Sequence, residues 1–133
     1  MLKKSYTGFI LWMVLYLGIL FSMAFLPIEN DGVMIRLILS FTALAVTGMM
    51  LIIYISEQVY WINGVTYEQA VDAGPERRKL FARRHLVRFG IFTAIYVLFA
   101  VVGQIIGIPF WIDIVVFTLG MIAAAISTIN IRL

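Results

Sequence analysis

The segment Gly48-Met49-Met50-Leu51-Ile52-Ile53-Tyr54-Ile55-Ser56 decides the fold class of this chain. Its apolar side chains occupy consecutive positions, and residues 95–103, Ile-Tyr-Val-Leu-Phe-Ala-Val-Val-Gly, have the same pattern. A strand of a membrane β-barrel would instead alternate polar and apolar residues. Because helices and closed barrels are the two structures that satisfy the whole backbone in lipid, this pattern indicates membrane helices.

Residues 48–56 end one of four long apolar runs. We expect helical spans at about 6–26, 33–56, 87–108 and 109–129, since about 20 residues of helix cross the hydrocarbon layer. Hydrophobic residues make up 63% of the chain, well above the roughly 45–50% of soluble domains. The sequence therefore predicts an all-α membrane protein, with residues 1–133 forming one domain of four transmembrane helices in an antiparallel bundle.

The first apolar run has a second interpretation, because Lys3 and Lys4 precede it and Ser22-Met23-Ala24 resembles a cleavage site. This pattern is typical of a secretory signal peptide. The run is longer than the apolar part of most signal peptides, so we expect a retained helix.

Charge predicts the orientation of these helices. Short loops rich in Lys and Arg stay in the cytoplasm. The two ends of the chain and the loop 57–86 would share one side of a four-helix protein, and they hold nearly all the basic residues. Arg36 is the one basic residue expected on the other side. We therefore predict a bacterial inner (plasma) membrane protein with both termini and the loop in the cytoplasm.

A basic segment follows Gly74-Pro75, which suits the start of a helix. We expect one helix from about Pro75 to Ile108, with its first turns at the lipid headgroups. The segment is the main topology determinant in this interpretation, and it can also contact anionic lipid of the inner leaflet. Nothing accompanies it that indicates a nucleic-acid site. Its basic residues are Arg77, Arg78, Lys79, Arg83, Arg84 and Arg88.

The loop before this segment is expected to be folded. Asn63-Gly64 between β-branched and aromatic residues is typical of a β-hairpin, but it could equally end a second helix that continues through Trp61. Thr66 and Gln69 have the spacing of a capping box, which predicts a short helix from Tyr67 to Ala73. The candidate partner surface of this loop comprises Tyr60, Trp61, Asn63, Gly64 and Tyr67.

Arg36, Gln104 and Asp113 are polar residues expected at similar depth, near the outer ends of three helices. Ionisable residues inside spans suggest function, so these residues could form a proton- or cation-linked site. The structural alternative, which we favour, is an Asp113–Arg36 ion pair assisted by Gln104, or side chains that reach back to the interface. Their shallow position argues against a transport centre at the bilayer midplane.

Small residues four positions apart allow membrane helices to approach closely. Gly103 and Gly107 form such a pair in the third expected span, and Gly120 and Ala124 form another in the fourth. These pairs predict either packing between these two helices or a contact between copies of the chain.

Catalytic and metal-binding patterns are missing from the sequence. The chain has no cysteine and one histidine, His85, which we expect to face solvent or headgroups because cations surround it. We therefore expect no enzyme activity, no cofactor and no metal site. The favoured function is an oligomeric or accessory, regulatory subunit of a larger membrane complex, which contacts lipid or a partner through its basic loop. The alternative is a small oligomeric transporter or channel lined by Asp113, Gln104 and Arg36.

Overall fold

The computed structural model describes all 133 residues, Met1–Leu133, and its regular elements are all helical. Three helices are long and apolar enough to cross a membrane: α2, α3 and α4. The first helix, α1, is also apolar but has only 17 residues. The prediction of a helical, multi-pass membrane protein is confirmed at this level. The elements are α1 (Thr7–Met23), α2 (Asp31–Ser56), the 3-10 turn η1 (Val59–Trp61), α3 (Tyr67–Ile106) and α4 (Phe110–Thr128).

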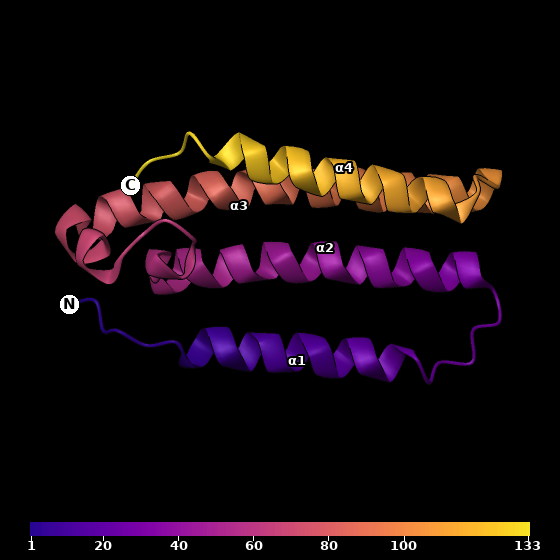
Figure 1. Ribbon diagram of the computed structural model, residues 1–133, viewed down its shortest axis with the longest axis horizontal. Helices are drawn as coiled ribbons and strands as arrows, with labels where there is room; N and C mark the ends of the chain where they lie inside the picture. Colours follow the sequence, from indigo (N-terminus) through magenta and orange to yellow (C-terminus); the bar gives the residue numbers. More distant parts are fainter.

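The four helices lie side by side along one long axis (Figure 1). α1 lies at one edge beside α2, and α3 and α4 lie on the other side of α2. Both termini and the connection from α2 to α3 are at the same end of the molecule, whereas the α1–α2 and α3–α4 connections are at the other. We call the first of these the basic end, because it holds Lys3, Lys4, Arg132 and the basic segment.

The loop after α2 differs from both alternatives drawn from the sequence. It contains no strand, and α2 ends at Ser56, where Glu57 takes a left-handed conformation with φ 59°. The amide of Val65 donates to the Ile62 carbonyl at 3.3 Å, so a turn does form at Asn63-Gly64. Gly64 has φ 90° but Asn63 does not have positive φ. A type I′ hairpin turn needs positive φ at both positions, so the predicted β-hairpin is wrong.

The start of α3 follows local rules. The side chain of Thr66 accepts from the Gln69 amide at 3.2 Å, and the side chain of Gln69 accepts from the Thr66 amide at 2.9 Å. The predicted capping box is therefore confirmed. The helical path breaks at Gly74, which has φ 75° and ψ 169°, and resumes from Pro75 to Ile106. A short helix and a long one thus follow each other, as the sequence predicts.

Two groups of buried side chains hold the helices together. The group at the basic end joins α2, the loop and α3, and the central group joins α2, α3 and α4. Yet only 20 of the 133 residues are buried, and large apolar side chains are exposed on all four helices. Exposed apolar surface on this scale is stable in hydrocarbon and not in water, which supports a membrane environment.

α1 has no buried residue, and specific contacts attach it to α2. Nε1 of Trp12 donates to the Ala45 carbonyl at 3.0 Å, and the hydroxyls of Tyr16 and Thr42 lie 3.1 Å apart. A Cβ atom on Gly48 would come within 2.6 Å of the Trp12 ring. The glycine therefore allows the indole of Trp12 to lie directly on α2.

Candidate functional site

Arg36 connects three elements at the end of the molecule opposite the basic end. Its Nε and Nη2 atoms donate to Oδ2 of Asp113 at 3.1 and 2.8 Å. Its Nη1 donates to Oε1 of Gln104 at 2.6 Å, and Nη2 also donates to the Ile108 carbonyl at 2.5 Å. The structure thus brings together the three polar residues that the sequence placed at one depth, and it adds a backbone carbonyl.

This network is buried but not fully paired. Asp113 is completely buried and Arg36 is 8% exposed. Oδ1 of Asp113 and the hydroxyl of Tyr96 are buried without a hydrogen-bond partner. The ring of Tyr96 packs on Phe117, one helical turn from Asp113, with ring centroids 5.2 Å apart. The sequence analysis did not include Tyr96, because a tyrosine in an apolar run gives no separate signal.

The chemistry of the network is that of a cross-link. The two charges neutralise each other, and most donors of Arg36 have acceptors, so little is left to bind a second group. A hollow of about 410 Å³ lies against Arg36 and Gln104 and is also lined by Asn30 and Asp31. The network therefore holds α2, α3 and α4 together close to a polar opening.

The basic segment contains residues with different environments. Arg78 is buried, and its Nε and Nη2 donate to Oε2 of Glu57 at 3.1 and 2.9 Å. Its Nη1 donates to the Ala70 carbonyl at 2.9 Å. Lys79 lies 3.7 Å from the other oxygen of Glu57. Arg78 thus fastens the short helix of α3 to the end of α2. The remaining four cations are exposed and have no acidic partner: Arg77, Arg83, Arg84 and Arg88.

Three aromatic residues of the loop hold the N-terminal segment through their polar atoms. The Tyr60 hydroxyl accepts from the Ser5 amide at 2.7 Å and donates to the Ser5 carbonyl at 2.8 Å. Nε1 of Trp61 donates to the same carbonyl at 3.0 Å, and the Tyr67 hydroxyl donates to the Leu2 carbonyl at 2.7 Å. Of the candidate partner surface, only Asn63 and Gly64 are exposed.

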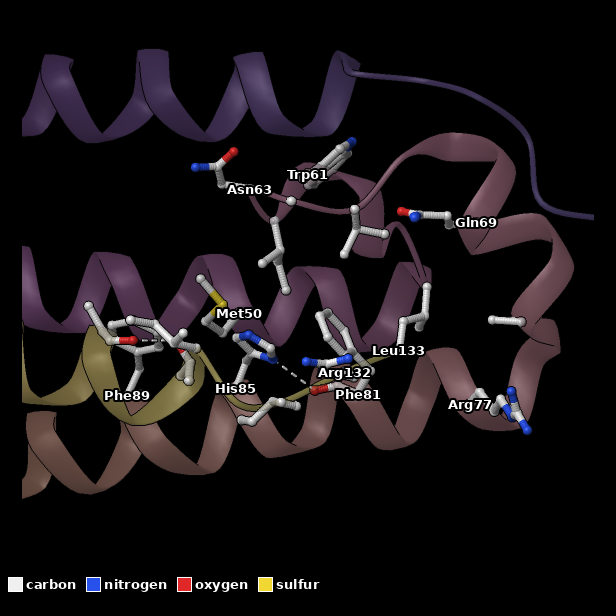
Figure 2. Close-up of a pocket in the computed structure, with 18 of the residues that line it drawn as sticks. Met50, Trp61, Asn63, Gln69, Arg77, Phe81, His85, Phe89, Arg132 and Leu133 are labelled. Atoms are coloured by element: carbon white, nitrogen blue, oxygen red, sulfur yellow. Dashed lines mark hydrogen bonds between the residues drawn. The ribbon is translucent and has the colours of Figure 1, made fainter.

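A cavity of about 990 Å³ opens at the basic end between the loop, α3 and the end of α4. Figure 2 shows its lining, with Phe81 and Phe89 from α3, Met50 from α2 and Arg132 from the last residues of the chain. Arg77 lies on its rim. An apolar interior with cations around it suits a molecule that has an apolar part and an anionic part.

His85 lines this cavity, and the expectation that it faces solvent or headgroups is wrong. It is 4% exposed, and its Nδ1 lies 3.0 Å from the Phe81 carbonyl. Burial lowers the pKa of His85, and the hydrogen bond to Phe81 opposes this shift. A carbonyl accepts only, so Nδ1 carries the proton of the neutral ring and Nε2 is left as an acceptor. His85 lies three residues after Ala82 and four before Phe89, so it shares a helix face with these apolar residues, and this spacing is the signal that could have indicated its burial.

The small residues have separate roles. A Cβ on Gly120 would lie 2.6 Å from Cε2 of Phe92, so α4 crosses α3 here, and Ala124 is buried in the same central group. Gly103 gives room to Nη2 of Arg36 and to Ile108. Gly107 ends α3 with φ 77°, and a Cβ atom placed on it would have no neighbour within 4 Å.

The chain matches no protein-family model, no curated protein and no solved structure. No group of three His, Asp or Glu side chains is placed to hold a metal ion. The class defined by fold and surface is a helical, multi-pass membrane protein.

Proposed function

We propose that the chain crosses the inner membrane of a bacterial cell four times, with its basic end in the cytoplasm. The observation that supports this orientation is that nine of the ten Lys and Arg residues lie at one end of the helices. Such asymmetry is typical of cytoplasmic faces. Arg36, the tenth, is neutralised by Asp113 and therefore does not compete with this signal.

α1 is the fourth span in this proposal. Its 17 residues are at the lower limit of about 17–25 for a spanning helix. It runs alongside α2 over most of the length of α1 (Figure 1), so it occupies the same layer as α2. Labelling of cysteines introduced at Glu29 and Arg83 tests this topology, because the two positions should react from opposite sides of the membrane. Labelling of both from one side would contradict it.

Within this topology, the protein acts as a non-enzymatic oligomeric or accessory subunit that contacts anionic lipid or a partner at its basic end. The contacts divide the cations into two kinds. Within the basic segment, Arg78 and Lys79 are used internally by Glu57, whereas the other four arginines remain free. Free cations beside the membrane attract anionic lipid and acidic protein surfaces.

Photo-crosslinking in cells tests the partner contact. A photoreactive residue at Asn63, on the exposed tip of the loop, should give a discrete product with a second copy or another protein. The same residue at Leu119, exposed on α4 and away from the basic end, is the matched control and should give lipid adducts only. Discrete protein products at Leu119 and none at Asn63 would contradict the proposal.

A transporter or channel is the second candidate, and the unpaired Oδ1 of Asp113 favours it. A buried carboxylate oxygen without a donor is a costly feature that a bound cation, proton or water would relieve. Flux through liposomes that contain the protein tests this candidate. Flux is compared only for variant protein that stays folded in the liposomes. On this basis, Asp113→Asn and Gln104→Leu should abolish any flux if the site conducts, and leave it unchanged if the network is structural.

A further inference from the structure

A groove of about 690 Å³ runs between α3 and the end of α4, outside the cavity of Figure 2. Three of the four free arginines of the basic segment line it: Arg83, Arg84 and Arg88. No acidic residue is among the lining residues, and none of the three arginines has an acidic partner elsewhere. The groove therefore has a net positive charge that the chain itself does not neutralise.

The same groove is apolar along its length. Leu80, Val87 and Ile91 contribute exposed apolar side chains from the same side of α3, since residues three, four or seven positions apart share a helix face. Ile91 is one turn deeper into the expected span than Val87. Ile91 lies deeper than all three arginines, so a ligand with its anionic group at the arginines can extend an apolar part towards Ile91.

The end of α4 completes the polar part. Ser127 and Asn130 line the groove opposite the arginines, and the Asn130 side chain makes no hydrogen bond within the chain. Its amide can donate to an oxygen of a ligand. The carbonyl end of α4 has a partial negative charge that opposes an anion, but three full positive charges outweigh it.

We infer that this groove binds one anionic phospholipid, with the phosphate between Arg84 and Arg88 and an acyl chain along Val87 and Ile91. The inference rests on the proposed function, in which the basic end faces an anionic leaflet. It narrows that proposal to one site and one ligand class. Arginine suits this role because its planar group binds two phosphate oxygens at once. Basic pockets between membrane helices on the cytoplasmic side are typical sites for anionic headgroups.

The cavity of Figure 2 is the main competing position for the same lipid. Its rim also has cations, but Asp72 is among its lining residues. The groove has three arginines and no acid, so charge complementarity favours the groove. This difference makes the two positions separable by substitution, because Arg77 belongs to the cavity alone.

The test uses the full-length protein in a neutral detergent, with phosphatidylglycerol and phosphatidylcholine titrated separately and bound lipid counted by native mass spectrometry. The wild type should bind the first phosphatidylglycerol more tightly than phosphatidylcholine. The variant Arg84→Gln/Arg88→Gln should lose about 25-fold in affinity for phosphatidylglycerol, from roughly five-fold per arginine. Its affinity for phosphatidylcholine should change little.

The matched control is Lys3→Gln/Arg77→Gln, which removes two charges of the basic end outside the groove. It should retain the wild-type affinity for phosphatidylglycerol. An equal loss in this control would overturn the groove as the site while leaving the wider proposal of anionic lipid contact intact. Equal binding of both lipids by the wild type would instead contradict lipid contact by the basic end altogether.

Two further measurements test which part of the ligand is bound and whether the Gln variant is misfolded. Arg84→Lys/Arg88→Lys retains the charge, so it should keep most of the affinity for phosphatidylglycerol. This result would show that the Gln variant loses affinity because it lacks the charge and not because it is unfolded. Glycerol 3-phosphate, which has the phosphate but no acyl chains, should not displace phosphatidylglycerol. Displacement at equal concentration would show that the apolar part of the groove contributes nothing, and would overturn the inference.

Discussion

Arg36 on α2 and Asp113 on α4 form an ion pair of 2.8 Å across 77 positions of sequence. The pair is buried, so its two charges depend on each other: each is stable in this position because the other is present. Removing one partner leaves a buried charge without compensation, whereas removing both leaves none.

We therefore expect Arg36→Met and Asp113→Leu each to lower the free energy of unfolding. The loss should be about 3–5 kcal/mol for Arg36→Met, which leaves the buried carboxylate of Asp113 without its partner. The double variant Arg36→Met/Asp113→Leu should recover most of this loss. Unfolding in mixed micelles of neutral detergent and SDS measures all three. Additive losses in the double variant would mean that the pair is not coupled.

Gly120 is expected to be intolerant of any side chain. In Gly120→Ala the new Cβ would lie 2.6 Å from Cε2 of Phe92, and this overpacking should cost about 1–3 kcal/mol. Gly18→Ala is the matched control, because nothing lies within 4 Å of a Cβ there. Thermal unfolding in detergent compares the two. Restoration of stability by Phe92→Leu in the Gly120→Ala background would identify the clash as the cause.

Tyr60→Phe should release the N-terminal segment without unfolding the helices. The variant loses the hydroxyl that both accepts from and donates to Ser5, at a cost of about 1 kcal/mol. Hydrogen exchange at residues 2–6 should become faster, while exchange in α3 should not change. Tyr54→Phe serves as the control, since the Tyr54 hydroxyl has no hydrogen-bond partner, and equal acceleration there would contradict the assignment.

His85 should make stability depend on pH. It lies before Val87, outside the expected span, and burial lowers its pKa below the usual 6.5. The unfolded chain therefore binds a proton at a pH where the folded protein does not, so stability rises with pH in this range. Stability should fall as pH drops below about 6.5 and level off below the folded pKa. Thermal unfolding of His85→Gln should lack this dependence, and an identical slope in the variant would assign it to another group.

The features that the sequence predicts well depend on residues close together in the chain, or on how far a residue lies from the end of its membrane span. The capping box of Thr66 and Gln69 and the break at Gly74 follow from local geometry. Arg36, Gln104 and Asp113 could be placed together because each lies a few residues from the outer end of its own span, and antiparallel helices share those ends.

Features decided by distant contacts were not predictable from local patterns. Asn63-Gly64 is compatible with a hairpin, but Tyr60 and Trp61 bond to Ser5, more than 50 positions away, and hold the loop in another shape. The burial of Arg78 depends on Glu57, whose left-handed backbone has no sequence signal. The available signal was the spacing of Arg78, Phe81 and His85, which puts the three side chains on one face of the helix.

The attachment of α1 has a consequence for biosynthesis. In the proposed topology, the N-terminal helix enters the bilayer before α2, the helix against which it packs, has been made. It has no buried residue of its own and is fixed afterwards, when Ala45 accepts a hydrogen bond from Trp12 and Gly48 admits its ring. Because α1 is made before α2, it stays surrounded by lipid until α2 is inserted beside it.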